Sequence, residues 1–279
     1  MDLLSGSYSG AVGEIQAGVF YVLWGEEGGT FRKAEALKGS DGAVLIIDKA
    51  SDSGLGSLRN ICTRPTAVDY DADGDLDLIV GNIEGNYFLF RGEGKGNFSP
   101  VSEAIMQGDQ ALNTGPHGDP FFVDWDGDGD LDLIAGSTAG GVMMAKNTAG
   151  KGQEMSFAKP QALIPALEKI GPRFADEPLR PSDSTRVCVD DLNGDGKLDL
   201  IVGDKLTLRR FAEGIQRAEG EKELAKLDQQ IDEIRRSYQE KLSEEEMQKR
   251  TKALQESSRA RAKLVTVKWT GHVWVYLQK

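Results

Sequence analysis

The sequence is poor in the residues from which proteins build zinc sites and disulfide scaffolds. Its 279 residues include two histidines, His117 and His272, and two cysteines, Cys62 and Cys188. Zinc is bound mainly through cysteine and histidine, so a zinc site is excluded. Two cysteines leave one disulfide open but do not suggest a disulfide scaffold. Because each cysteine lies in a strand-like stretch, we predict that both are small buried side chains.

Long apolar runs and an excess of positive charge are missing as well. No window approaches the roughly 18 apolar residues of a membrane-spanning helix, so no membrane span is predicted. Lysine and arginine number 33 against 45 aspartates and glutamates, which gives a net charge of −12. An acidic surface repels phosphate backbones, and we therefore expect no nucleic-acid partner. The first residues, Met1–Gly6, have neither the basic residues nor the apolar stretch of a signal peptide.

Glycine, by contrast, is abundant at 34 residues, and the sequence repeats itself. Three segments align without gaps, at residues 69–81, 124–136 and 191–203, and a shortened copy lies at residues 2–6. Their closing glycines are 75, 55 and 67 residues apart. Such spacings suit a unit of a few strands with variable loops, and they do not suit a helical solenoid, whose repeats are shorter.

Each repeat contains the same order of strand-like stretches. Apolar stretches precede the aspartate-rich loops, and the stretch after each loop is apolar on both faces, as in a strand covered on two sides. Third strands are predicted at residues 19–24, 87–90, 141–144 and 273–277, and weaker fourth strands at 30–33, 97–100 and 156–159. The sequence therefore predicts an all-β fold, a β-propeller of about four blades that are antiparallel four-stranded sheets. We predict a single domain over residues 1–279, with blade repeats at about 2–68, 69–123, 124–190 and 191–279.

Residues 214–263 depart from this pattern and predict an α-helical hairpin inserted in the last blade. Apolar side chains spaced by three and four residues share one helix face: Leu224, Leu227, Ile231, Ile234, Tyr238 and Leu242. Ser243–Glu246 has the form of a capping box, so a second helix is expected to begin there. The face around Ile231, Ile234 and Tyr238 is left for the propeller, for a second copy or for another partner, so self-association through this hairpin is one expectation.

The aspartate-rich loops carry the strongest chemical signal. In the pattern Asp-x-Asp-x-Asp-Gly-x-x-Asp, the side chains at positions 1, 3, 5 and 9 and the carbonyl at position 7 can converge on one cation, and the glycine permits the sharp turn. Hard oxygen ligands in this number favour Ca²⁺ over Mg²⁺, and without a cation the carboxylates repel one another. An EF-hand is excluded because position 12 is Val80, Ala135 or Val202 and not glutamate.

These loops resemble those of the FG-GAP/VCBS repeat proteins, whose β-propeller blades, including those of integrin α-subunits, carry a nine-residue calcium loop. The resemblance covers about residues 2–212 and 264–279. It implies about three Ca²⁺ sites with the ligands Asp69, Asp71, Asp73, Asp75 and Asp77; Asp124, Asp126, Asp128, Asp130 and Asp132; and Asp191, Asn193, Asp195, Lys197 and Asp199. In each set, the residue at loop position 7 (Asp75, Asp130 or Lys197) acts through its carbonyl. Because Asn193 and Lys197 lower the charge of the third loop, we expect the weakest binding there.

Two departures concern the ends of the repeat series. Asp2 matches position 9 of a loop whose first eight positions are missing, and Lys279 follows the third strand of the last blade. We read this either as a fragment of a longer chain or as a ring that closes with strands missing.

Three functions are compatible with this sequence. The first is a non-enzymatic, calcium-stabilised binding or structural module for a protein or glycan ligand, located outside the cytoplasm (extracellular, periplasmic or at the cell surface). The second is a polysaccharide lyase or hydrolase, which the absence of a Gly-x-Ser-x-Gly motif disfavours; His117 and His272 read as loop residues. The third is a lectin that uses exposed aromatics such as Trp24, Trp125 and Trp274, although tryptophan in a blade more often packs in the core.

Overall fold

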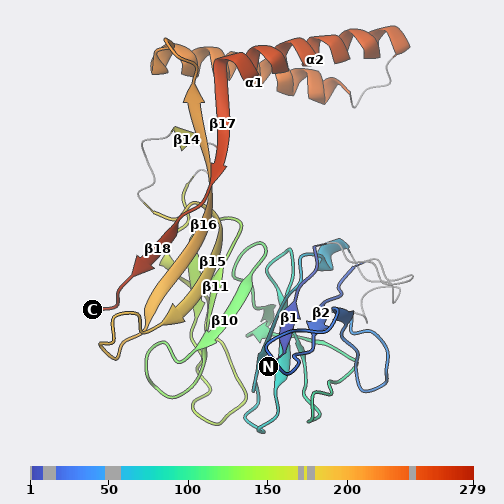
Figure 1. Ribbon diagram of the computed structural model, residues 1–279, viewed down its shortest axis with the longest axis vertical. Coiled ribbons are helices and arrows are strands. Elements are labelled where there is room, and N and C mark those ends of the chain that lie inside the picture. The colour runs from blue at the N-terminus through green and yellow to red at the C-terminus, as the bar shows by residue number, and fades with distance from the viewer. Residues whose placement is uncertain (1, 9–16, 48–57, 169–172, 175–179, 239–242) are drawn as a thin grey trace. The chain divides into compact units, whose positions relative to one another are not determined.

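A computed structural model describes residues 2–8, 17–47, 58–168, 173–174, 180–238 and 243–279 (Figure 1). The chain divides into two compact units. The first contains the described residues within 1–170, 180–205 and 271–279, and the second those within 171–179 and 206–270. The two units are described separately below.

The first unit consists of four antiparallel sheets in chain order. The first sheet contains β1 (Leu3–Ser5), β2 (Tyr21–Leu23) and β3 (Glu35–Ala36), and the second contains β4 (Arg64–Val68), β5 (Asp77–Gly81), β6 (Tyr87–Phe90) and β7 (Glu103–Ala104). The third contains β10 (Asp119–Val123), β11 (Asp132–Gly136), β12 (Val142–Ala145) and β13 (Gln161–Ile164). The fourth contains β15 (Asp183–Asp190), the first part of β16 (Asp199–Phe211) and β18 (Val273–Tyr276). A short turn of 3-10 helix (Leu58–Asn60) and a ribbon of β8 (Met106–Gln107) and β9 (Gln110–Ala111) complete this unit.

The three aspartate loops close the hairpins β4–β5, β10–β11 and β15–β16 in the same register. The ninth loop residue pairs with the residue just before the loop, as in Val68 with Asp77 and Val123 with Asp132. The loops therefore leave into strands and not into helices, as the sequence predicts.

Each sheet packs on the next through one of its two faces. In β5, Ile79 lies in the core shared with the third sheet, whereas Leu78 and Val80 lie in the core shared with the first sheet. In β11, Ile134 faces the fourth sheet and Leu133 faces the second. We call the face toward the next sheet the front face and the opposite one the rear face. This alternation is why the strand after each loop is apolar at every position.

The glycine that ends each of these strands lets the next sheet approach closely. A Cβ atom added at Gly81 would lie 2.3 Å from the Gly118 carbonyl oxygen, and one added at Gly136 would lie 2.4 Å from that of Thr185. Gly6 meets the next sheet in the same way, whereas at Gly203 an added Cβ would find no atom of the described chain within 4 Å. Close sheet-to-sheet contact thus requires glycine at this position in the first three sheets.

The structure corrects three details of the prediction. Among the described residues, only the second and third sheets have four strands in one ordered path. The phenylalanines of the predicted fourth strands, Phe31, Phe98 and Phe157, form isolated bridges instead, and the actual fourth strands follow a few residues later. Cys62 is buried as predicted, but Cys188 is exposed, and both are free thiols. The mostly β architecture is confirmed, and the number of blades remains a prediction.

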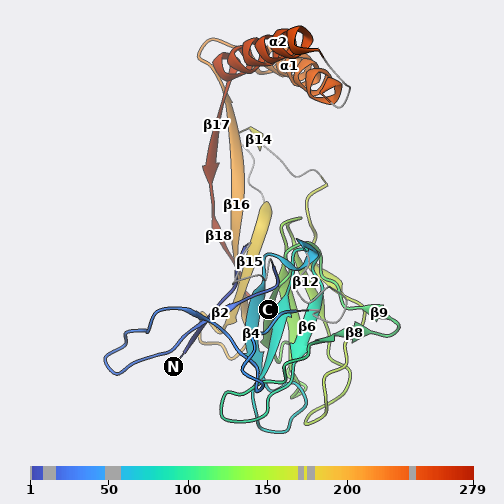
Figure 2. The same ribbon diagram turned by 90° about the vertical axis from the view of Figure 1, so that its right-hand side faces the viewer.

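The second unit contains the rest of β16 with β17 (Val265–Thr270), β14 (Arg173–Phe174), α1 (Arg217–Ser237) and α2 (Glu244–Leu264). Figures 1 and 2 (Figure 2 from the side) show α1 and α2 side by side. Contacts between Asp228 and Arg261 and between Tyr238 and Thr251 run in opposite chain directions, so the helices form an antiparallel hairpin. The capping box at Ser243 is present.

The apolar face of α1 is covered in part within the second unit. Leu224, Leu227 and Ile231 are buried, whereas Ile234 and Tyr238 are half-buried. The expectation that Ile231 is free to contact a partner is therefore wrong. None of the side chains of α2 is buried. Among the residues described, neither helix is apolar enough to cross a lipid bilayer.

Candidate metal-binding loops

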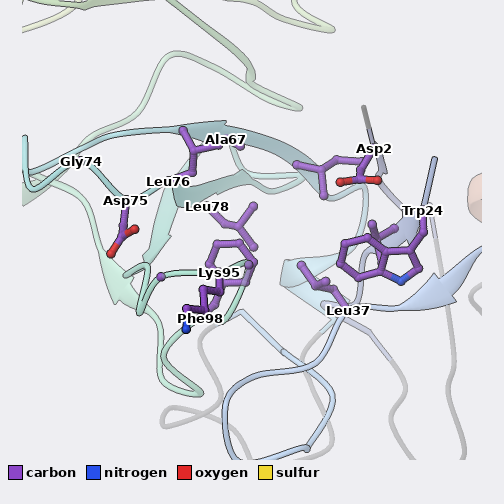
Figure 3. A pocket seen from close by; sticks show the side chains of 14 residues that line it. Asp2, Trp24, Leu37, Ala67, Gly74, Asp75, Leu76, Leu78, Lys95 and Phe98 are labelled. Atoms are coloured by element: carbon purple, nitrogen blue, oxygen red, sulfur yellow. The ribbon is translucent and has the colours of Figure 1, made fainter. Parts of the chain in front are cut away.

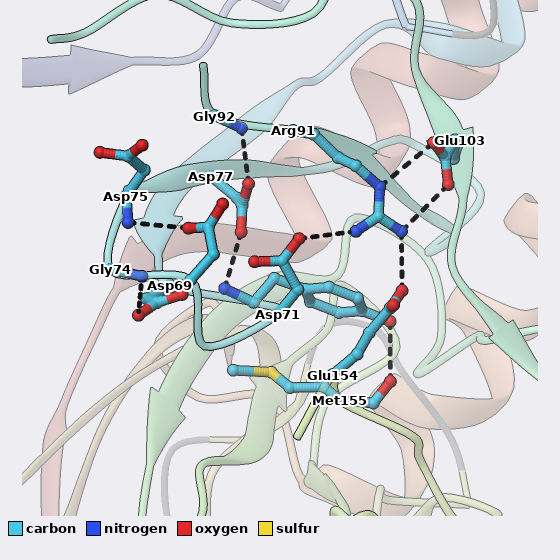
Figure 4. Close-up of polar contacts among 12 residues, drawn as sticks. Asp69, Asp71, Gly74, Asp75, Asp77, Arg91, Gly92, Glu103, Glu154 and Met155 are labelled. Atoms are coloured by element: carbon cyan, nitrogen blue, oxygen red, sulfur yellow. Dashed lines mark hydrogen bonds and ion pairs between the residues drawn. The ribbon is translucent and has the colours of Figure 1, made fainter. Parts of the chain in front are cut away.

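In the loop of residues 69–77, three carboxylates meet. Asp69, Asp71 and Asp77 each place one oxygen so that all three oxygens lie within 4.8 Å of one another (Figure 4). The Oδ1 atoms of Asp69 and Asp71 are buried and have no hydrogen-bond partner among the described residues. Buried acceptors without a donor are costly, and a cation would satisfy them. This part of the structure therefore fits a divalent cation.

Arg91 partly neutralises this loop from the end of β6. Its guanidinium contacts Asp71 at 2.9 Å, Glu154 at 2.7 Å and Glu103 at 3.3 Å (Figure 4). Hydrogen bonds to Glu154 and Glu103 raise the pKa of Arg91 above its ordinary value. Arg91 therefore links this loop to the connection between β12 and β13, where Glu154 lies.

The loop of residues 124–132 has a second carboxylate cluster, and a lysine side chain pairs with it. Oxygens of Asp124, Asp126 and Asp128 lie within 4.8 Å of one another. The ammonium group of Lys146 bonds to Asp126 and lies 3.0 Å from Asp128. The hydrogen bond from Lys146 lowers the pKa of Asp128, and the carboxylates of Asp126 and Asp128 raise the pKa of Lys146. Asp130 has a buried Oδ1 without a described partner, and burial raises its pKa.

Arg91 and Lys146 are residues of the two candidate sites that the sequence analysis did not identify. Each follows the third strand of its sheet and stands 14 residues after the ninth aspartate of its loop, Asp77 or Asp132. Each pairs with the third loop position. This constant spacing of a basic residue is the signal that could have found them.

The loop of residues 191–199 is organised differently. Asp191 accepts backbone hydrogen bonds from Gly194 at 2.7 Å and Gly196 at 2.8 Å, and these bonds, that of Gly196 foremost, lower its pKa. The Asn193 side-chain amide donates to Asp195 at 3.1 Å. Within the described residues, this loop does not bring three carboxylates together as the other two do.

The ninth aspartate fixes each loop to its sheet. Asp77 accepts hydrogen bonds from the backbone N–H groups of Tyr70 at 2.7 Å and Gly92 at 2.6 Å (Figure 4). The same contacts recur in Asp132 with Trp125 and Asn147, in Asp199 with Leu192 and Gln278, and by one bond in Asp2 with Gly25. Burial raises the pKa of both Asp77 and Asp132. The sequence indicated these residues as cation ligands; the structure gives them this anchoring role in addition.

The remaining predicted ligands lie at the loop tips. Asp73 and Asp75 are exposed, and the Asp73 carboxylate accepts the Asp75 backbone N–H at 2.8 Å. The residues at position 7 (Asp75, Asp130 and Lys197) each use their backbone N–H to bond the side chain at position 5. This bond shapes the tight turn in all three loops.

A pocket of about 450 Å³ lies between the first and second sheets, beside the first loop (Figure 3). Its walls are apolar, with Leu4, Leu78 and Phe98 among them, and Asp2, Asp75 and Lys95 add charged groups. Trp24 also lines it and donates through Nε1 to Glu35. Between the second and third sheets the corresponding space is filled by Tyr70, whose hydroxyl donates to the Met155 carbonyl at 3.0 Å and whose pKa burial raises to about 12.

The two histidines, and the tryptophans Trp125 and Trp274, are packed or hydrogen-bonded within the fold. His117 has a positive φ of 57° and bonds Thr138 through Nδ1 at 3.0 Å. Burial, then the charges of Arg64 and Arg186, lower its pKa. His272 donates its backbone N–H to Asp204. Trp125 and Trp274 pack against the core between the third and fourth sheets.

Comparison with known proteins agrees with this description. Cartilage acidic protein 1 of Xenopus tropicalis is 24% identical to this chain over 164 residues. That match covers 58% of this chain and 23% of the relative, so the chain corresponds to less than a quarter of that protein's length. Residues 69–135, which contain the first two loops, match the family of FG-GAP-like repeats. The chain thus carries an FG-GAP-like repeat, and the resemblance indicated by its aspartate loops is confirmed.

Proposed function

We propose that the chain is a non-enzymatic binding module whose aspartate loops are stabilised by Ca²⁺. The observation that supports this most is the cluster of Asp69, Asp71 and Asp77 with two buried carboxylate oxygens that lack a hydrogen-bond donor in the described structure. The hairpin geometry, the FG-GAP-like match and the second cluster at residues 124–128 also favour it. Calcium in such loops fixes their shape and, through the ninth aspartate, the hairpin that carries them.

Calcium titration of metal-stripped protein tests this function. We expect about three sites by calorimetry and a rise in melting temperature on adding Ca²⁺, since a ligand that binds only the folded state stabilises it. Asp128→Ala should raise the calcium concentration needed for this rise more than Asp195→Ala, because the second loop gathers more charge. Absence of binding, with a melting temperature that EDTA leaves unchanged, would refute the metal function.

We also propose that the protein works outside the cytoplasm. Low-affinity calcium modules operate at roughly 10⁻⁴–10⁻³ M Ca²⁺, far above cytosolic levels. Similarity to a protein named for cartilage supports the same location. Native protein recovered from a cytosolic fraction, folded and free of calcium, would contradict this part.

Glycan binding is the second candidate, and the pocket that Trp24 lines is the observation that favours it. Sugars are commonly held by an aromatic face together with carboxylates, and Asp2 and Asp75 flank this pocket (Figure 3). Trp24→Ala should then abolish binding to a glycan panel while calcium binding remains. A protein ligand instead of a glycan would leave every member of the panel unbound.

A further inference from the structure

The front face of the fourth sheet is apolar and exposed. Val273 is 73% exposed, Val275 53% and Leu277 53%. Across the sheet, Val275 pairs with Ile201, which pairs in turn with the exposed Cys188, so these three side chains form one row. The row and its uncharged neighbours on the same side define the open front face: Cys188, Ile201, Gly203, Val273, Val275 and Leu277. Two charged residues flank it on β15, Arg186, which pairs with Gly203, and Asp190.

The other three sheets show what covers such a face. The residue that corresponds to Ile201 is Leu4, Ile79 or Ile134, and each packs on the rear face of the following sheet. The glycine that corresponds to Gly203 meets a backbone carbonyl of that following sheet, whereas Gly203 itself faces open space. Three repeats of one contact therefore specify the partner of the open front face: the rear face of another sheet of this type.

In the first sheet, the rear face is not covered by any of the other described sheets. In β1, Leu4 packs forward, and its neighbour Leu3 points the other way and is 46% exposed. Leu23, which pairs with Leu3 across β2, and Tyr21 are half-buried on the same side. This set, Leu3, Ser5, Tyr21 and Leu23, is also uncharged. Among the described sheets, β1 and β2 lie at one end of the series, and β16 and β18 lie at the other (Figure 1).

We propose that the open front face of the fourth sheet binds the rear face of the first sheet of a second copy, so that two copies associate head to tail. A second copy is favoured over an unrelated protein because the two complementary halves are both present, and both uncovered, on this one chain. Two copies would contribute eight sheets, which is within the four to eight blades of closed propellers, and a pair that closes in this way makes the same contact twice about a twofold axis. This inference does not depend on calcium binding.

Oligomeric state tests the proposal with matched variants. Light scattering coupled to size exclusion should give twice the chain mass of 30.3 kDa for the unmodified protein at high concentration. Val275→Asp and Leu3→Asp should each yield monomers, because one places a charge on the front face and the other on the rear face. Val101→Asp is the control, because Val101 is 56% exposed in the first unit and lies on neither face; it should remain dimeric. Circular dichroism should be unchanged in all three, since the replaced side chains are exposed.

Three results would overturn the proposal. A monomeric unmodified protein at the highest soluble concentration would do so. A dimer that Val275→Asp breaks and Leu3→Asp leaves intact would mean that two fourth sheets pair with each other. A dimer that survives both substitutions would place the contact elsewhere, for example on the helical hairpin. Proximity gives a positive test: in a Leu3→Cys variant, a short bismaleimide should link Cys188 of one copy to the new thiol of the other, and Cys188→Ser should abolish the link.

Discussion

Lys146 and Arg91 supply positive charge to the two carboxylate clusters in this structure. Both loops gather carboxylates at positions where water or a cation must offset their repulsion. The Lys146 ammonium group bonds two members of the cluster at residues 124–128, and the Arg91 guanidinium bonds one member of the cluster at residues 69–77. Under the proposed function, a calcium ion that enters either loop would therefore compete with a basic side chain, and its affinity would depend on how easily that side chain leaves.

Replacing Lys146 should strengthen calcium binding at the second loop. In Lys146→Met, Ca²⁺ no longer displaces an ammonium group from Asp126 and Asp128, and we expect affinity at that site to rise about fivefold. The metal-free variant should melt at a lower temperature, because its carboxylates have lost their counter-charge. Calorimetry and thermal melts measure both effects.

Lys151→Met is the matched control for this substitution. Lys151 is an exposed lysine close to Gly129 of the same loop, so its loss removes the same charge from the same neighbourhood. If the two variants changed calcium affinity equally, Lys146 would act only through the general field and not by occupying the cation's place.

At the scale of the sheet, the closing glycine sets how closely one sheet can follow another. Gly81 and Gly136 end strands whose next neighbour in space is a backbone carbonyl of the following sheet, and backbone cannot move aside as a side chain can. The strand's alternating apolar residues bury both faces only at this close spacing. The packing of successive sheets therefore depends on the absence of a side chain at this glycine position.

Alanine at these glycines tests that dependence with an internal control. Gly136→Ala should destabilise the protein by about 1–3 kcal/mol, because its Cβ would overlap the Thr185 carbonyl oxygen and force the sheets apart. Gly203→Ala meets no described atom and should change the free energy of unfolding of the monomer by less than about 0.5 kcal/mol. Chemical denaturation of both variants, below the concentration at which copies associate, gives the comparison.

Local pattern predicted these elements well, and tertiary contacts explain where it did not. The hairpins, the third strands and the capping box at Ser243 follow from short-range patterns that sequence displays directly. The weak fourth strands were misplaced because Phe98 and Phe157 are apolar for packing into cores and not for strand pairing. Cys188 resembles a core residue in sequence, and it is exposed only because no described sheet covers its face.

The same distinction holds for the candidate site. The loop pattern showed where carboxylates gather, but the anchoring role of the ninth aspartate comes from backbone groups up to 79 residues away, as for Asp199 and Gln278. Arg91 and Lys146 reach the loops from a different strand, so their role depends on the hairpin register. Contacts of this range have no signature within a nine-residue motif.

At the scale of the whole chain, each unit has its own source of stability. The first has three apolar cores between its four sheets, whereas in the second α1 packs against α2 and buries Leu224, Leu227 and Ile231. The units share strand β16, whose pairing partner changes from β18 to β17 along its length. The ladder continues in one register through this change, so Asp204 faces His272, with an N–H to carbonyl bond of 3.1 Å.

This register allows the second unit to be removed cleanly. Deleting residues 206–270 and introducing Lys205→Asn leaves a two-residue Asn-Gly connection between Asp204 and His272, the connection that best closes an antiparallel hairpin. Phe174→Ser avoids exposing a ring that stacks on Phe211, 4.7 Å away between centroids. The shortened protein should fold with the β spectrum of the first unit, bind calcium with unchanged affinity and still associate through the faces of Val275 and Leu3. Loss of association with folding intact would assign self-association to the helical hairpin, and an unfolded product would show that the first unit needs the second for its stability.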